Sequence, residues 1–363
     1  WPDSGLKVVA AALPDPVFII DQRGRIRYAN AAAGTFGPAR VGDPLSFKLR
    51  VPAFLEAVDR VAAGGGIERI AWTDRMPTER WFEAFIAPLA LPSGESVAAL
   101  RPAFVLVLVR DLTENQRVDR LRADFVANAS HELRTPLAAL SGFIETLQGP
   151  ARNDAVARDR FLAVMAEQAA RMKRLIDDLL SLSRIEMRAH LPLTGEVDLT
   201  DLVRHAADTL APLADELGVA VETDLGDAPL VVRGDRDELL QVFTNLVENA
   251  LKYGASGGRV VVSAAAEHAG GHGAAVVRVR DYGPGIAPEH LPRITERFYR
   301  VDVATSRAKQ GTGLGLAIVK HIVGRHRGRL AIEAPADGGA LFTVRLDLLD
   351  PTVIQAVGEG EKT

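Results

Sequence analysis

The chain has 363 residues, of which 47% are hydrophobic and 25% are charged, the composition of an ordinary globular protein with room for two or three domains. Its formal net charge of -4 gives no bulk attraction to nucleic acid or anionic lipid, so no direct nucleic-acid partner is expected. The chain has no cysteine, which excludes disulfides, thiolate metal sites and cysteine catalysis, and it has no run of about 18 apolar residues that would span a membrane.

Residues 1–110 are predicted to form a small α+β domain. The stretch PVFIIDQRGRIRYAN has the pattern of two strands around a turn at Gly24. RWFEAFIAPL and AFVLVLVRD are apolar and rich in β-forming residues, so both are predicted to be strands. Residues 1–130 contain no histidine or cysteine, which argues against a histidine-ligated haem or a cysteinyl-flavin sensor in this domain.

Residues 111–190 are predicted to form a helical hairpin. DLTE resembles a capping box with Asp111 at the N-cap, and Gly149–Pro150 ends the long helix that follows. A second helix is predicted over 153–190. Its apolar stripe needs more packing partners than the other helix of one hairpin provides. The economical solution is a four-helix bundle formed by dimerisation, with packing on a neighbouring domain as the alternative. The stripe consists of Phe161, Met165, Met172, Leu175, Leu179 and Leu182.

Residues 191–350 are predicted to form a third domain, in which strands and helices mix and the second half is rich in glycine. Residues 351–363 have the character of a flexible tail. The chain starts at Trp1 without a methionine or a signal-like segment, so we expect a fragment of a longer protein whose missing N-terminal part holds membrane segments.

The stretch ASHELRTPLAAL combines a histidine, a carboxylate and a threonine on one predicted helix. His131 and Thr135 are four residues apart and therefore share a face. Pro136 cannot donate to the carbonyl of Glu132, so the helix should bend just after the histidine. An exposed imidazole beside a carboxylate that accepts its proton suits a nucleophile, although the pair by itself is more typical of an ordinary surface histidine.

The stretch NLVENALKYG places two amides and a cation along one helix face. Asn245, Asn249, Lys252 and Tyr253 are separated by four, three and one residues. Amide oxygens suit a hard cation such as Mg²⁺, and a lysine suits a phosphate group. A solvated polar face is the alternative, and it is common for two such residues but not for four.

Two glycine-rich segments follow in the chain. RVRDYGPGI is predicted to end a strand and to enter a loop with Asp281, Gly283 and Gly285, which either admits a ligand closely or is an ordinary Gly-Pro turn. GTGLGLAIVKHIV is predicted to be a loop that runs into a helix whose N-terminus favours phosphate. No βαβ unit precedes it, so a dinucleotide fingerprint is not indicated. The loop begins with Gly311, Thr312, Gly313, Leu314 and Gly315.

Five stretches together resemble the H, N, G1, F and G2 boxes of bacterial sensor histidine kinases of the HisKA plus HATPase_c type, in family order and over about residues 111–347. They are FVANASHELRTPLAAL, NLVENALKYG, DYGPGI, ERFYRVD and GTGLGLAIVK. In LPRITERFYRVD, Thr295 stands where many members have phenylalanine, and this is similar to the phosphate-regulon sensor kinases (the PhoR subfamily). The region from DPVFIIDQRGRIRYAN to VRDLTE resembles a PAS sensor domain.

The resemblance implies a multidomain α+β protein: a PAS-like domain, a dimerising helical hairpin and an α/β sandwich of the GHKL ATP-binding type. It implies that His131 attacks the γ-phosphate of ATP and that Glu132 acts as general base. It further implies that Thr135 positions water when phosphate is removed from a partner, and that Arg300 meets the γ-phosphate.

For the ATP-binding domain, the resemblance implies that Asn249 holds Mg²⁺ with Asn245 nearby. Lys252 is expected to contact phosphate and Tyr253 to flank the adenine, while Asp281 accepts from the adenine amine. Gly283 and Gly285 belong to the same adenine-side loop. The lid over the nucleotide is expected to be formed by Gly311, Thr312, Gly313, Leu314 and Gly315.

The resemblance also implies partners and a setting. The expected protein is a homodimer that transfers phosphate to an aspartate of a response regulator of the winged-helix transcription-factor type, acts as its phosphatase, and serves phosphate-starvation signalling. It is expected to be the cytoplasmic portion of a sensor tethered to the inner membrane. The alternatives are a kinase for another signal, such as envelope stress or the cell cycle, a non-kinase GHKL ATPase, and a catalytically dead scaffold.

Overall fold

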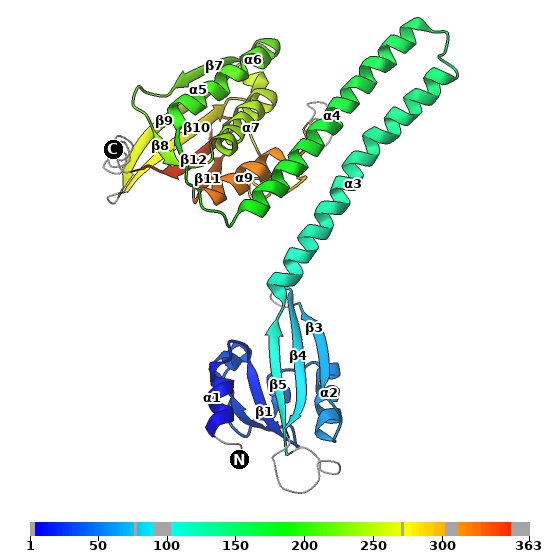
Figure 1. Cartoon of the computed structure of the whole chain (residues 1–363), viewed down its shortest axis with the longest axis vertical. Coiled ribbons are helices and arrows are strands. Elements are labelled where there is room, and N and C mark those ends of the chain that lie inside the picture. Colours follow the sequence, from blue (N-terminus) through cyan, green and yellow to red (C-terminus); the bar gives the residue numbers. More distant parts are fainter. Residues whose placement is uncertain (1–3, 76–77, 90–102, 270–271, 302–310, 350–363) are drawn as a thin grey trace, which may run out of the picture. The chain divides into compact units, whose positions relative to one another are not determined.

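The computed structural model describes residues 4–75, 78–89, 103–269, 272–301 and 311–349. The predicted tail at 351–363 therefore lies outside the described residues. The chain divides into two compact units, Trp1–Val126 and Ala127–Thr363, and the division falls inside the long helix α3 (Thr113–Gln148). Figure 1 shows the helices and strands of each unit.

The first unit is built on a five-stranded antiparallel sheet in the order β2-β1-β5-β4-β3. The strands predicted around Gly24 are present as β1 and β2, and Gly24 has the positive φ of 70° that such a tight turn requires. The elements are α1 (Ser4–Ala12), β1 (Val17–Asp21), β2 (Ile26–Ala29), η1 (Ala31–Phe36), η2 (Leu45–Phe47), α2 (Pro52–Ala62), β3 (Glu68–Asp74), β4 (Arg80–Leu89) and β5 (Phe104–Asp111).

One face of this sheet is buried because its strands alternate. In β4 and β5 every second side chain is buried, and α2 contributes a stripe of buried residues to the same core. Trp72 of β3 stacks on Phe82 of β4 with ring centroids 5.5 Å apart, and Phe36 lies 5.4 Å from Phe82. The sequence prediction of a small α+β domain with these strands is confirmed.

Two long helices, α3 and α4 (Ala155–Arg188), form the predicted hairpin. Helix α3 starts at Thr113, one residue later than an N-cap at Asp111 predicts, because Asp111 ends β5; its carboxylate still accepts the Thr113 backbone N–H at 2.9 Å. The second helix is capped by Asp154, whose carboxylate accepts the N–H groups of its first turn. The predicted bend does not interrupt α3, which stays α-helical through Pro136.

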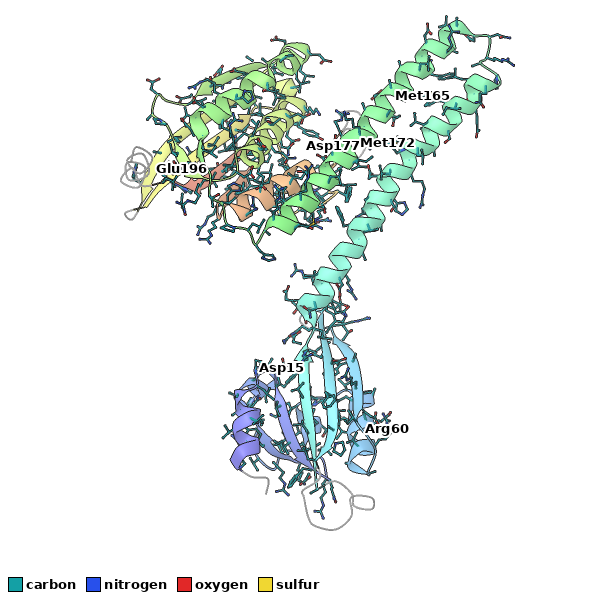
Figure 2. The ribbon with its side chains drawn as sticks, viewed as in Figure 1. Asp15, Arg60, Met165, Met172, Asp177 and Glu196 are labelled. Atoms are coloured by element: carbon teal, nitrogen blue, oxygen red, sulfur yellow. The ribbon has the colours of Figure 1, made fainter. Side chains whose placement is uncertain are left out.

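The hairpin leaves much of its apolar surface in water. Phe143 of α3 packs on Phe161 of α4 with ring centroids 5.3 Å apart, and Figure 2 marks Met165 and Met172 along α4. Other large apolar side chains of the two helices stay more than two fifths exposed: Leu137, Ile144, Leu162, Ile176 and Leu180. The helices of the described ranges are all too short or too polar to cross a lipid bilayer.

The rest of the second unit is an α/β domain on a five-stranded sheet in the order β11-β12-β10-β9-β7, in which β7 and β9 are parallel and the other pairs antiparallel. Its elements are β6 (Glu196–Asp198), α5 (Leu199–Thr209), α6 (Ala211–Leu217), β7 (Ala220–Asp224), β8 (Val231–Arg233), α7 (Arg236–Gly254), η3 (Ala255–Gly257), β9 (Arg259–Ala269), β10 (His272–Asp281), α9 (Gly315–Arg325), β11 (Arg329–Glu333) and β12 (Leu341–Asp347).

Helix α7 is the centre of this domain. It contacts β9 and β10 of the sheet, and α5 and α9 pack beside it. Its buried residues, among them Leu239, Phe243 and Leu246, recur every three or four positions, so the opposite face is left for polar side chains. This packing fixes the face that carries the polar residues of NLVENALKYG.

Candidate functional site

A cavity of about 490 Å³ lies in the second unit and gathers residues from four of the five sequence motifs. Its size falls within the range of small-molecule sites. The lining side chains and loop residues of the motifs are Asn245, Asn249, Lys252, Tyr253, Asp281, Gly285, Arg300, Gly311, Thr312, Gly313 and Gly315. Among the residues predicted to bind the nucleotide, Gly283 and Leu314 do not line this cavity, but their backbone N–H groups make hydrogen bonds within its loops.

The amide-bearing face of α7 forms one wall. Asn245 donates from Nδ2 to the carbonyl of Gly315 at 3.5 Å, a long contact that joins α7 to the start of α9. Lys252, for which a phosphate contact is expected, pairs with Glu248 at 2.6 Å, one helical turn before it. Glu248 also lines the cavity. It stood within the motif but was not singled out from the sequence, because one acid on a polar helix face is unremarkable.

Asp281 lies at the end of β10 with 5% of its surface exposed. Its Oδ1 accepts the backbone N–H of Gly283 at 3.0 Å, which fixes the carboxylate toward the cavity loop. Burial raises the pKa of Asp281, while the N–H groups of Gly283 and Ala340 oppose that rise. A side chain at Gly283 would meet the Cα of Gly254 at 2.7 Å, so this position requires glycine.

The loop before α9 is tied to the segment of the F box. Gly313 has a φ of 75°, and its carbonyl accepts the backbone N–H of Phe298 at 2.8 Å. The Thr312 hydroxyl accepts the backbone N–H of Leu314 at 3.2 Å, and Leu314 is fully buried. The loop thus ends at the first turn of α9, an 11-residue helix whose Leu314 N-cap makes no side-chain hydrogen bond to the backbone N–H groups of that turn.

The donors around the cavity fit a nucleotide triphosphate. Arg300 lines the cavity with 6% of its side chain exposed, and among the described residues its buried Nε has no hydrogen-bond partner. Within the same described ranges, no cluster of three or more His, Cys, Asp or Glu side chains is arranged to hold a metal ion. The oxygen atoms that line the cavity from helix α7 include those of the Asn245 and Asn249 amides and of the Glu248 carboxylate.

A second hollow, of about 320 Å³, contains the predicted nucleophile. His131 and Glu132 line it from α3, and Arg297, Phe298 and Tyr299 line it from the α/β domain. His131 is exposed, as predicted from the helix pattern. The hydroxyl of Thr135 donates to the carbonyl of His131 at 3.3 Å and is also exposed.

Glu132 is the link between the two hollows. Its Oε2 accepts from Nη2 of Arg171 at 3.1 Å and from Nη2 of Arg300 at 3.0 Å. Arg171 belongs to α4, whereas Arg300 also lines the nucleotide-sized cavity. The carboxylate beside His131 is thereby joined, through one guanidinium, to that cavity.

Helix α4 contributes a further wall that the sequence did not reveal. Arg174, Asp177 and Asp178 line the large cavity, and Figure 2 marks Asp177 on α4. The hydroxyl of Thr312 donates to Oδ2 of Asp178 at 2.6 Å. Burial raises the pKa of Asp178, and the hydrogen bond from Thr312 opposes that rise. No motif marks these residues, and Asp178 precedes Thr312 by 134 positions.

Comparison with known families assigns a match to each part of the chain. Residues 234–350 match the histidine kinase-, DNA gyrase B- and HSP90-like ATPases. Residues 121–188 match the His Kinase A (phospho-acceptor) domain, and residues 10–117 match the PAS fold. The predicted fold class is confirmed: a PAS domain, a helical hairpin and an α/β ATP-binding domain.

Individual relatives agree with the family matches. The chain is 36% identical over 351 residues to the phosphate regulon sensor protein PhoR of Pseudomonas aeruginosa, covering 92% of this chain and 72% of that protein. It is 36% identical over 259 residues to the sensor-like histidine kinase SenX3 of Mycobacterium tuberculosis, covering 71% of this chain and 61% of SenX3. The solved structure of histidine kinase ThkA in complex with response regulator protein TrrA has the same fold, with a TM-score of 0.51, 20% identity and coverage of 96% of this chain and 99% of that one.

Proposed function

The chain belongs to the sensor histidine kinases, which are protein-histidine kinases, and we propose that His131 is the residue that it phosphorylates. The proposal rests on Arg300, because this one side chain contacts both the cavity and the residue beside His131. This arginine lines the nucleotide-sized cavity and donates to Glu132, the neighbour of His131. ATP held in the cavity would thus have its γ-phosphate end on the side of the proposed nucleophile.

The residues support a direct transfer of the γ-phosphoryl group from ATP to His131. We assign the Nε2 lone pair of His131 to the new N–P bond, while the bond from the γ-phosphorus to the bridging oxygen breaks and its electron pair leaves with ADP. The Nδ1 proton of the imidazole passes to Glu132, which acts as the base. Arg300 balances the negative charge of the phosphoryl group in transit.

Nucleotide binding is assigned to the polar wall of the large cavity. We assign Asp281, which lines the cavity, as the hydrogen-bond acceptor for the adenine amine, and Tyr253 as the residue at the flank of the ring. Lys252 leaves Glu248 for a phosphate oxygen, and Asn249 with Asn245 would hold Mg²⁺, which prefers a few protein oxygens and completes its shell with phosphate and water. Bound there, the ion would offset the negative charge of the phosphate groups.

The lid is assigned to the loop before α9, with Gly311, Thr312, Gly313, Leu314 and Gly315. Gly283 and Gly285 shape the adenine-side loop opposite to it. Nucleotide exchange needs the α/β domain to move away from α3 and α4, and the segment between Arg188 and Glu196, which contains Leu191 and Pro192, is the proposed hinge.

We further propose a homodimeric kinase that passes phosphate to a response regulator and also removes it. The uncovered apolar side chains of α3 and α4 support the dimer. The partner class is supported by the ThkA–TrrA complex, and phosphate-responsive signalling by the 36% identity to PhoR. A winged-helix transcription factor is the response regulator proposed.

Incubation with ATP labelled at the γ-phosphate tests the proposed activity. The wild-type chain is expected to take up label that is lost in acid and stable in base, the behaviour of phosphohistidine. His131→Gln should take up no such label while its affinity for ATP stays unchanged, because His131 lies outside the nucleotide cavity. Hydrolysis of ATP without labelled protein would identify an ATPase, and neither reaction would identify a scaffold.

A further inference from the structure

Arg171 contacts Glu132 from a helix that none of the five motifs includes. It lies on α4, 39 residues along the chain from Glu132, and its Nη2 donates to Glu132 Oε2 at 3.1 Å. The Arg171 side chain is 14% exposed and that of Glu132 is 24% exposed. Partial exclusion of water makes such a pair stronger than an ion pair at a fully exposed surface.

We propose that Arg171 is a positioning residue for the phosphorylation of His131: it holds the Glu132 carboxylate by one oxygen and leaves the other to accept the imidazole proton. The inference rests on the proposed roles of His131 and Glu132. It adds to them a residue that touches neither ATP nor the reacting histidine atoms.

The contacts of the two arginines support different roles for the two oxygens of the Glu132 carboxylate. Both guanidiniums donate to the same oxygen, Oε2, at 3.1 Å and 3.0 Å. Oε1 takes part in neither bond. A carboxylate oxygen has more than one lone pair, so Oε2 satisfies both donors and Oε1 stays available for the proton of the neighbouring imidazole.

The two arginines differ in the element that carries them. Arg300 is 168 residues from Glu132 and belongs to the α/β domain, so it leaves with that domain whenever nucleotide exchanges. Arg171 and Glu132 sit on the two helices of one hairpin, and their pair persists through that motion. Arg171 is therefore the partner that keeps the carboxylate oriented before each encounter with ATP. A glutamate without it would sample several rotamers and be in the productive one for less of the time.

The test measures kcat and KM for ATP in autophosphorylation of the full chain. Arg171→Gln is expected to lower kcat roughly tenfold or more, because orientation of a general base is lost, and to leave KM for ATP within about twofold. Arg171→Lys should recover part of kcat, since it restores the charge without the planar fork. Arg160→Gln removes an exposed arginine of the same helix as a matched control and should change neither constant.

A double-mutant cycle separates positioning from support of the hairpin. If Arg171 acts through Glu132, Arg171→Gln should add little to the loss already caused by Glu132→Gln. The inference is overturned if Arg171→Gln keeps the wild-type kcat, or if it lowers kcat by the same factor in the Glu132→Gln background. Should Arg171→Gln fail to fold, Arg171→Lys decides: an intermediate kcat supports positioning and a wild-type kcat refutes it. A wild-type chain that forms no phosphohistidine would instead overturn the proposed function, and the role of Arg171 with it.

Discussion

At the scale of single residues, the site depends on polar groups that are buried and held by the backbone. Asp281 is 5% exposed and receives the Gly283 N–H, so its carboxylate has one fixed orientation. Arg300 is 6% exposed and keeps a buried Nε without a hydrogen-bond partner among the described residues. Groups of this kind are costly in an empty cavity and favourable once a ligand pairs with them.

Replacing Asp281 should weaken ATP binding. Asp281→Ala removes the acceptor assigned to the adenine amine, and loss of one such hydrogen bond costs about 1–3 kcal/mol, or roughly tenfold to a hundredfold in Kd. Calorimetric titration with Mg-ATP measures the change. Asp347→Ala, at an exposed position of the same sheet, is the control. Unaltered affinity in Asp281→Ala would refute the adenine assignment.

Thr135 should separate the two activities. Its hydroxyl lies one helical turn beyond His131 and is exposed, where it can orient a water but cannot replace the base. We expect Thr135→Ala to leave autophosphorylation intact and to slow dephosphorylation of the response regulator roughly tenfold to a hundredfold, the equivalent of one lost hydrogen bond. Thr135→Ser, which keeps the hydroxyl, should retain most of both rates. Equal losses of both activities in Thr135→Ala would indicate that it only supports the helix.

Several of these residues could be predicted from the sequence, because a helix spacing or a glycine pattern places them locally. Asn245, Asn249 and Lys252 share one face of α7 as their spacing requires. The pairing of Lys252 with Glu248 could not be predicted, since either residue had other neighbours within reach.

At the scale of secondary-structure elements, side chains of α4 contact residues of both hollows. Its Arg171 donates to Glu132, which lines the hollow around His131, and its Asp178 accepts from Thr312 in the loop before α9. Farther along, Ser181 donates to Gln241 of α7 at 2.8 Å, and Arg325 of α9 donates to the carbonyl of Arg188 at 3.1 Å. The sequence predicted α4 and its apolar stripe but not these contacts, because they are set by how helices far apart in the chain pack.

The contact between Asp178 and Thr312 should depend on pH. Burial raises the pKa of Asp178, so the state in which it is buried against Thr312 holds its proton at higher pH than a state in which it faces water. The buried state is therefore most favoured below the ordinary pKa of aspartate, loses stability as pH rises through the window up to the raised pKa, and changes no further above it. Asp178→Asn should remove this dependence.

The equilibrium between the state in which Asp178 is buried against Thr312 and the state in which it faces water can be followed by measuring a distance between α4 and the α/β domain. Because the chain has no cysteine, Ala163→Cys and Asp227→Cys can carry a pair of spin or fluorescent labels at exposed positions. The population of the short distance should fall as pH rises, and should become insensitive to pH in Asp178→Asn. Asp159→Asn removes an exposed carboxylate of the same helix that lies away from Thr312 and should keep the wild-type profile. A flat wild-type profile would contradict the assignment to Asp178.

At the scale of the whole molecule, the hairpin is incomplete as a single chain. Leu137 is 57% exposed and Ile144 is 44% exposed, although both lie on the apolar face of α3. Each such side chain left in water forgoes roughly 1.5–3 kcal/mol of burial. The order of three domains along the chain could be predicted from composition and motifs. The sequence favours a second copy only through the apolar stripe predicted over 153–190, and the proposed dimer would cover the exposed face of α3 as well.

The protein is therefore expected to be a dimer through α3 and α4 at micromolar concentration, as measured by light scattering. Leu137→Lys combined with Ile144→Lys should give monomers, because two charges would be buried in the bundle. Val41→Lys, which changes an exposed apolar residue of the first unit, should leave the dimer intact. A monomeric wild-type chain would contradict the four-helix bundle.

The most direct measurement for the whole account is the position of the phosphoryl group after incubation with Mg-ATP. The chain has eight histidines, and mass-spectrometric mapping at neutral or basic pH, where phosphohistidine survives, distinguishes them. We predict that the phosphoryl group is found on His131, the histidine that lines the hollow beside Glu132 and Arg297. Phosphate on another histidine, or on a serine, threonine or aspartate with His131 unmodified, would contradict the assignment of the nucleophile.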